Sequence, residues 1–308
     1  FFVKQKTAYE IYQCDWSSDV CSSDLEKFAW LESLGFTLFP QDGSGIGSAD
    51  QMLVASAAVE DTVPEVIRAK ELGCARMSRA ELLAQLFNAA PLGIAVGGTS
   101  GKSTVTGMIG WILTHAGRDP TIMNGAVMKN FRAPDAPFAS ARVGSGSAFV
   151  SEVDESDGSI ALYRPNVAVL NNVSLDHKSM EELRALFGDF LNRAAVAVVN
   201  ADDPESVALL PRAHAVLTFG FSPEAQVSVE PGSVVEGATS IGATVIDRRD
   251  GAGHALTLQV PGRHNLANAL AALATADAAG VPLAQGVAAL AGFAGLARRF
   301  DVVGTSPG

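Results

Sequence analysis

Cysteine is scarce in this chain of 308 residues: there are three, and Cys14 and Cys21 both fall within the first 25 residues. Cys74 is the one thiol in the rest of the chain. A single thiol forms neither a disulfide framework nor a cysteine metal cluster. The pattern excludes a disulfide-stabilised secreted domain and predicts a protein of the reducing cytoplasm.

Positive charge is also in short supply, because 22 Lys and Arg face 33 Asp and Glu, for a net charge of −11. A nucleic-acid partner needs clustered Lys and Arg to neutralise its phosphates, so we expect none. No apolar run approaches the roughly 20 residues that span a bilayer. The N-terminus shows no apolar leader segment either. We therefore expect no membrane partner.

The first 25 residues (FFVKQKTAYEIYQCDWSSDVCSSDL) lack the period of a helix or a strand. They resemble a translated sequencing-adapter read-through, of the kind that recurs at the ends of unrelated metagenomic fragments. We expect residues 1–25 to be such an artefact or disordered, and exclude them from the fold as one would an expression scar. A disordered native leader is the alternative.

Apolar residues are ample, at 48% of the chain, and the length is that of about two domains. Short apolar runs bounded by turn or helix signals predict buried parallel strands at 92–98, 148–153, 167–173, 196–200 and 215–219. Apolar periodicity predicts helices at 102–116, 180–194, 263–279 and 282–291. Between 226 and 260 the pattern changes to alternation, which predicts a small antiparallel addition. The fold class is therefore α/β with a mostly parallel sheet.

The sharpest motif is GTSGKST at residues 98–104, between a predicted strand and a predicted helix. Its glycines let backbone N–H groups close around phosphate oxygens, and the helix directs the positive end of its dipole at them. We expect Lys102 to reach the β and γ phosphates and the Ser103 hydroxyl to bind Mg²⁺. The general phosphate-loop pattern has glycine where this chain has Val96. A structural turn with a chance lysine is the alternative.

Three more polar motifs follow predicted strands or open a predicted helix. The acidic run 152–157 (EVDESD) ends a strand, where carboxylates face the ligand crevice of an α/β sheet and suit Mg²⁺; a solvated loop is the alternative. The run 171–177 (NNVSLDH) ends with His177, which could ligate a metal, bind phosphate or be structural. The run 262–269 (GRHNLANA) opens a helix, where His264 and Asn265 could cap the helix or bind a base.

In their order along the chain, GTSGKST, SEVDESD, NNVSLDH, NADDP (200–204), GRHNLANALAA and Arg298-Arg299-Phe300 resemble the Mur ligases of peptidoglycan synthesis. The resemblance spans about residues 26–308, and that family commonly lacks the glycine that Val96 replaces. It implies an ADP-forming ligase that uses ATP and Mg²⁺. It implies a catalytic role for Lys102, Glu152 and His177, and magnesium binding by Ser103, Glu152 and His177. It implies that these residues bind ATP: Gly98, Thr99, Ser100, Gly101, Lys102, Ser103, Thr104, His264, Asn265, Asn268, Arg298 and Arg299.

Within the family, the sequence DESD at 154–157 is similar to the type that adds L-alanine to UDP-N-acetylmuramate, so we expect these two molecules as substrates. Several Mur ligases bind a second Mg²⁺ with a carbamylated lysine, but no lysine follows Lys178 in this chain. The alternatives are a murein-tripeptide recycling ligase, another ligase of the superfamily, and a non-catalytic nucleotide-binding paralogue.

The resemblance also implies a domain plan. We expect a partial Rossmann-like domain for the UDP-sugar at 26–91 and a P-loop-type ATP-binding domain at 92–297, with residues 298–308 beginning a C-terminal domain. The glycine-rich loop that opens the first domain in this family is not found in this sequence. We therefore expect a fragment that does not ligate by itself.

Overall fold

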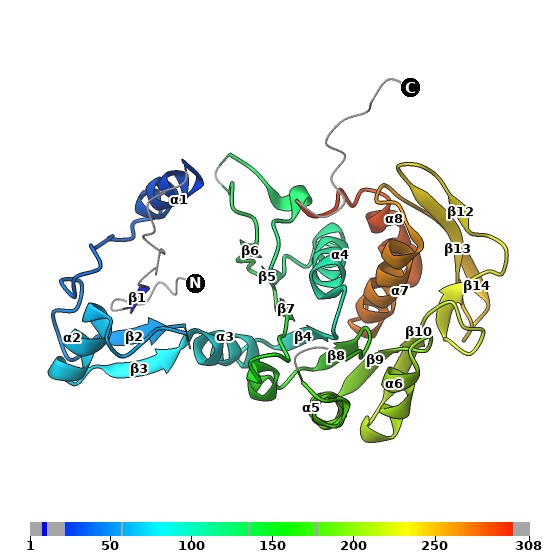
Figure 1. Cartoon of the computed structure of the whole chain (residues 1–308). Coiled ribbons are helices and arrows are strands. Elements are labelled where there is room, and N and C mark those ends of the chain that lie inside the picture. The colour runs from blue at the N-terminus through cyan, green and yellow to red at the C-terminus, as the bar shows by residue number, and fades with distance from the viewer. Residues whose placement is uncertain (1–7, 11–21, 57, 135, 176–177, 298–308) are drawn as a thin grey trace. The chain divides into compact units, whose positions relative to one another are not determined.

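The computed structural model describes residues 8–10, 22–56, 58–134, 136–175 and 178–297. The chain divides between Leu86 and Phe87 into two compact units, each with a sheet of its own (Figure 1). The division falls inside helix α3 (Arg79–Asn88), shortly before the boundary expected at residue 91.

In the first unit, the described strands form a parallel sheet in the order β1 (Ala8–Glu10), β2 (Met52–Ala55) and β3 (Ala75–Ser78). The same unit contains the helices α1 (Ser22–Ser33) and α2 (Pro64–Leu72). A small core joins Leu53 of β2 to Val66 of α2. Strand β1 lies within the segment that we expected to be an artefact or disordered, and it pairs with β2 in parallel. The origin of residues 1–25 stays a prediction.

In the second unit, the described strands form one mixed sheet whose central part is parallel. In spatial order the parallel strands are β5 (Thr121–Met123), β7 (Ala148–Glu152), β4 (Leu92–Gly97), β8 (Val167–Leu170), β9 (Val196–Asn200), β10 (Val216–Phe219) and β11 (Val227–Val229). One edge carries the antiparallel β6 (Ala141–Arg142). The other carries the antiparallel set β12 (Val235–Glu236), β13 (Ile241–Asp247) and β14 (Ala252–Leu258). The predicted α/β class is confirmed, with its mostly parallel sheet and small antiparallel addition.

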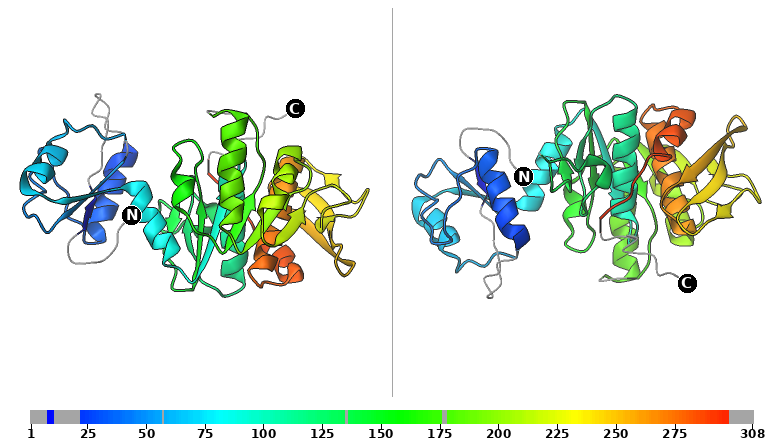
Figure 2. Two further views of the ribbon diagram at one scale, coloured as in Figure 1. Left: turned by 90° about the horizontal axis from the view of Figure 1, so that it is seen from below. Right: turned by 90° about the horizontal axis from the view of Figure 1, so that it is seen from above.

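Helices cover both faces of this sheet. On one face lie α4 (Lys102–His115), α7 (Arg263–Ala278) and α8 (Leu283–Leu290), and on the other α5 (Met180–Asn192) and the short α6 (Pro204–Ala208) (Figure 1). Figure 2 shows α5 in front of the strands from below and α4 in front of them from above. The 3₁₀ turns are η1 (Lys129–Phe131), η2 (Ser159–Leu162) and η3 (Leu210–Arg212). Throughout the described ranges, no helix is both long and apolar enough to cross a membrane.

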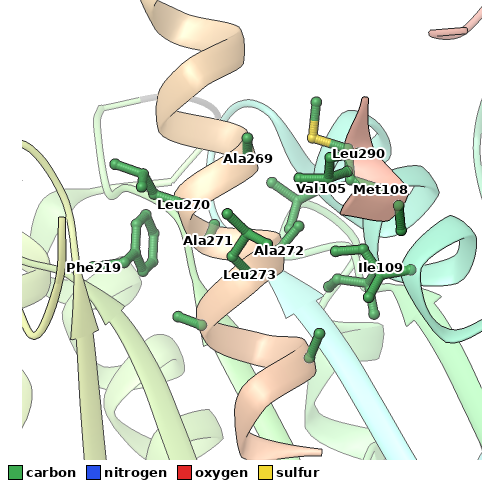
Figure 3. Packing of buried hydrophobic residues seen from close by; sticks show 14 of the residues in the cluster. Val105, Met108, Ile109, Phe219, Ala269, Leu270, Ala271, Ala272, Leu273 and Leu290 are labelled. Atoms are coloured by element: carbon green, nitrogen blue, oxygen red, sulfur yellow. The ribbon is translucent and has the colours of Figure 1, made fainter. Parts of the chain in front are cut away.

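Helix α7 is buried on nearly all sides, because it packs against both the sheet and α4. Its alanine-rich sequence explains how: small side chains let a helix approach its neighbours closely. Ala269, Ala271 and Ala272 are fully buried in this way, between the strands and the apolar side chains of α4 (Figure 3). A helix that is apolar all round is typical of such a position.

The strand order brings three strand ends together. The chain passes from β4 through α4 to β5 on one side, returns to β7 beside β4, and then crosses to β8 on the other side of β4. In register, Val96 near the end of β4 pairs with Glu152 of β7, and Gly97 pairs with Leu170 of β8. A point where an open α/β sheet reverses its strand order is where such sheets bind ligands, at the carboxyl ends of the strands.

A substitution of Phe219 tests the packing of this core. It is fully buried at the end of β10, and Figure 3 shows it beside Leu270 of α7. We predict that Phe219→Ala lowers the free energy of unfolding by about 3–5 kcal/mol, because the lost contacts leave a cavity. Val235→Ala is the control, since Val235 is 69% exposed, and should change it by less than about 0.5 kcal/mol. Denaturant unfolding measures both, and similar losses in the two variants would contradict the packing described.

Candidate functional site

The loop from Gly98 to Gly101 joins β4 to α4. Gly98 has a φ of 129° and Gly101 a φ of 82°, conformations that favour glycine because it has no Cβ. The first hydrogen bond of α4 runs from the Val105 N–H to the Gly101 carbonyl, at 3.0 Å. The N–H groups of the preceding residues in α4 therefore have no partner within the helix. They form a positive helix end at the carboxyl edge of the sheet, a position suited to an anion.

Two asparagines at the end of β8 hold this loop. The Thr99 N–H donates to the Asn172 carbonyl at 3.0 Å, and the Ser100 N–H donates to Asn172 Oδ1 at 2.9 Å. The Ser100 carbonyl accepts from Asn171 Nδ2 at 2.9 Å and from Asn172 Nδ2 at 3.1 Å. The N–H groups of Thr99 and Ser100 are thus turned toward Asn172, whereas those of α4 remain at the helix end. This difference favours the first turn of α4 as the part that binds an anion.

Gly101 is also packed between β8 and α7. A Cβ on this glycine would lie 2.3 Å from Asn171 Nδ2 and 2.6 Å from Asn268 Oδ1. Those two side chains contact each other, since Asn171 Nδ2 donates to Asn268 Oδ1 at 3.2 Å. Both asparagines are buried. Asn268 therefore supports, from the side of α7, the GTSGKST segment at residues 98–104, which we call the phosphate loop.

The side chains of Lys102 and Ser103 each meet a carboxylate at the end of β7 or in the loop that follows it. The Lys102 ammonium donates to the Gly98 carbonyl at 2.7 Å and to Glu155 Oε2 at 2.9 Å. The Ser103 hydroxyl donates to Glu152 Oε2 at 2.7 Å. The predicted acidic motif thus lies against the phosphate loop, as the strand order requires.

The Ser103–Glu152 pair offers two oxygen atoms of the kind that Mg²⁺ prefers. Neighbouring oxygen ligands of an octahedral Mg²⁺ lie about 2.9 Å apart, because each is about 2.0–2.1 Å from the metal. The 2.7 Å between Ser103 Oγ and Glu152 Oε2 is close to that spacing. Gly125 leaves space for the carboxylate, since a Cβ there would lie 2.1 Å from Glu152 Oε1. In the described residues, no three His, Cys, Asp or Glu are grouped to hold a metal ion.

Asn124 supports the backbone of Ser103. Its Nδ2 donates to the Ser103 carbonyl at 2.9 Å, and its Oδ1 accepts from the Ala126 N–H at 3.1 Å. Asn124 is 2% exposed and comes directly after β5. It fixes the segment that contains Gly125 against the start of α4.

Of the remaining predicted residues, the structure describes Asn265 and His264. Asn265 is buried, and its Nδ2 donates to the Pro261 carbonyl at 2.7 Å. His264 is exposed at the start of α7, and both of its alternatives, helix capping and base binding, stay predictions. His177, Arg298 and Arg299 lie outside the described residues, and their roles stay predictions.

Sequence reasoning gave no role to four residues that the structure brings to the site: Asn124, Glu155, Asn171 and Asn172. A signal was available for the pair Asn171-Asn172, because two amides directly after a buried strand must lie at its carboxyl end. Glu155 stood within the quoted acidic motif, but the spacing of the motif does not say which carboxylate faces the lysine.

The sequence profile of the Mur ligase middle domain matches residues 96–276. The chain belongs to the Mur ligase family. The match begins at the end of β4 and includes the phosphate loop, the acidic loop, the asparagine pair and the start of α7.

Similar proteins carry ligase names. A UDP-N-acetylmuramate–L-alanine ligase of Solidesulfovibrio magneticus is 38% identical over 304 residues, covering 94% of this chain and 64% of the relative. A solved UDP-N-acetylmuramate–alanine ligase of Thermotoga maritima has a TM-score of 0.77 at 27% identity, covering 92% of this chain and 64% of that one. A murein peptide ligase of Psychrobacter arcticus also has a TM-score of 0.77, at 25% identity and with 90% and 62% covered. The chain thus spans somewhat less than two thirds of the length of each of these three proteins.

Gly101 provides a test of the loop geometry. We predict that Gly101→Ala weakens binding of a non-hydrolysable ATP analogue by roughly tenfold or more, because the added Cβ displaces Asn171 and Asn268 and the loop that they hold. Gly251→Ala is the matched control: Gly251 has a φ of 79°, and nothing lies within 4 Å of an added Cβ. Calorimetric titration compares the variants. Equal binding by the two would show that the contacts of Gly101 do not shape the nucleotide site.

Proposed function

We propose that this chain is the nucleotide-binding part of an ATP-dependent, ADP-forming ligase that joins L-alanine to the carboxylate of UDP-N-acetylmuramate. One observation carries the proposal. The phosphate loop lies where the strand order reverses, and it brings Lys102 and the Ser103–Glu152 pair together there. The names of the relatives in Solidesulfovibrio magneticus and Thermotoga maritima support the two substrates.

The nucleotide phosphates would bind at the N-terminus of α4. There the backbone N–H groups and the helix dipole favour negative charge, and the Lys102 ammonium adds a full positive charge close to them. Asn171, Asn172 and Asn268 would keep the loop in the conformation that presents these donors. Positioning and electrostatic stabilisation supply most of the catalysis in phosphoryl transfer, so a rigid loop matters for rate as well as affinity.

Mg²⁺ would be held by Ser103 and Glu152, and when bound it would neutralise charge on the transferring phosphoryl group. The muramate carboxylate would attack the γ-phosphorus and release ADP, which leaves an acyl phosphate. The amine of L-alanine would then attack the acyl carbon, so that phosphate leaves and an amide forms. The described residues serve the first step, because they converge on the phosphates.

A second candidate is a ligase that attaches a murein peptide in place of L-alanine. The specific observation in its favour is the TM-score of the Psychrobacter arcticus murein peptide ligase, which equals that of the Thermotoga maritima ligase. The identity is slightly lower, at 25% against 27%, and the curated relative at 38% is an L-alanine ligase. These values favour L-alanine as the acceptor.

A cytoplasmic site of action stays a prediction from the single cysteine outside the first 25 residues.

Lys102 tests nucleotide binding in the chain as it stands. We predict that Lys102→Ala weakens binding of a non-hydrolysable ATP analogue by roughly ten- to hundredfold, the loss expected for hydrogen bonds to a charged group. Lys70→Ala is the control, because that lysine is exposed in the first unit and pairs with Asp61. Calorimetry in Mg²⁺ measures the dissociation constants. Unchanged affinity in Lys102→Ala would refute the phosphate-loop assignment.

The acceptor is tested on the complete gene product. We predict that ADP release with UDP-N-acetylmuramate depends on L-alanine, with a kcat/KM roughly tenfold or more above that with a murein tripeptide. A coupled ADP assay with each acceptor gives the ratio. Preference for the tripeptide would identify the second candidate. ATP binding without turnover on either acceptor would instead indicate a non-catalytic nucleotide-binding protein.

A further inference from the structure

Glu155 is a buried carboxylate that the proposed reaction does not use. Its side chain is 6% exposed, and its Oε2 lies 2.9 Å from the Lys102 ammonium, whose own side chain is 19% exposed. Glu152, three residues earlier at the end of β7, meets the Ser103 hydroxyl instead. Two carboxylates of one motif therefore have different partners in the phosphate loop.

The position of Glu155 is fixed by its loop. The Val153 N–H donates to the Val96 carbonyl at 3.0 Å, which ties the loop to the end of β4. The Asp154 side chain accepts from the Ser156 N–H at 2.8 Å, and the Gly158 N–H donates to the Glu155 carbonyl at 3.3 Å. These local hydrogen bonds form a tight turn around Glu155. The carboxylate is thus held toward Lys102.

The Lys102 ammonium has three N–H donors, of which one points to Gly98 and one to Glu155. A phosphate-loop lysine acts by donating to nucleotide phosphates. Glu155 offers that ammonium a negative charge in a poorly hydrated position, where ion pairs are stronger than in water. A nucleotide phosphate must therefore draw the ammonium away from Glu155, or share it.

We propose that Glu155 is a positioning residue that competes with nucleotide phosphate for the Lys102 ammonium and so sets the affinity of the phosphate loop. This inference rests on the proposed nucleotide binding. It assigns Glu155 an effect that acts through Lys102, in contrast to Glu152, which would act as a ligand of the metal. Removing the Glu155 charge frees the ammonium for phosphate, so the nucleotide should bind more tightly.

A double-mutant cycle tests the coupling. The dissociation constant of a non-hydrolysable ATP analogue is measured by calorimetry, at fixed salt and Mg²⁺, for the wild type, Glu155→Gln, Lys102→Met and the double variant. We expect Glu155→Gln to tighten binding by roughly three- to thirtyfold when Lys102 is present, the size typical of coupled residues in one network. In the Lys102→Met background the same change should alter affinity by less than about twofold.

Asp157→Asn is the matched control, because it removes the same charge from an exposed carboxylate of the same loop. It should leave affinity unchanged in both backgrounds. If Glu155→Gln does not unfold cooperatively, Glu155→Asp decides, since it keeps the charge but draws the carboxylate back by one methylene. Tighter binding by that variant supports competition, and unchanged binding overturns it.

Equal tightening by Glu155→Gln with and without Lys102 would mean direct repulsion between carboxylate and phosphates, and would overturn the inference. Unchanged or weaker binding in Glu155→Gln would overturn it as well. In both cases binding by the wild type would leave the proposed function standing. A wild-type chain that does not bind the analogue would refute the proposed nucleotide binding itself, and the role of Glu155 with it.

Discussion

The close packing around Gly101 is the constraint on which the site depends. This glycine has a positive φ and lies against Asn171, at the end of β8, and Asn268, on α7. No side chain fits between them. The phosphate loop can therefore contact the sheet and α7 at once, so that a loop, a strand end and a helix from distant parts of the sequence become one structure. Because both asparagines are buried and hydrogen-bonded, the arrangement resists small shifts.

The charges of the site follow from that packing. With the loop fixed against β8, Lys102 and Ser103 on the first turn of α4 face the loop after β7. Glu152 then meets a hydroxyl and Glu155 an ammonium, so the two carboxylates of one acidic motif have different partners. The strand order explains this proximity, since β7 and β8 flank β4 and all three end at the same edge of the sheet.

Much of this was predictable from sequence, and the failures have physical reasons. The predicted strands and helices of the second unit lie within a few residues of β4, β7, β8, β9 and β10 and of α4, α5, α7 and α8, because each has a clear apolar period or run. Strand β5 has three residues and β6 two, too few for any period, and neither was predicted. Asn124, which follows β5 and holds the Ser103 carbonyl, was missed along with that strand. Asn265 donates to the Pro261 carbonyl, a contact that the sequence pattern did not predict.

The sequence by itself determined the phosphate loop, since its glycines, lysine and serine act through local backbone geometry and one helix end. It determined the order of the motifs and hence the family. Only the tertiary structure decided which polar groups meet. Glu152 and Glu155 are alike as residues, but the end of β7 places one beside Ser103, and the turn that follows places the other beside Lys102. Asn268 likewise supports the loop because α7 packs beside β8, a contact that no local pattern encodes. Such pairings depend on strand order, which only long-range packing sets.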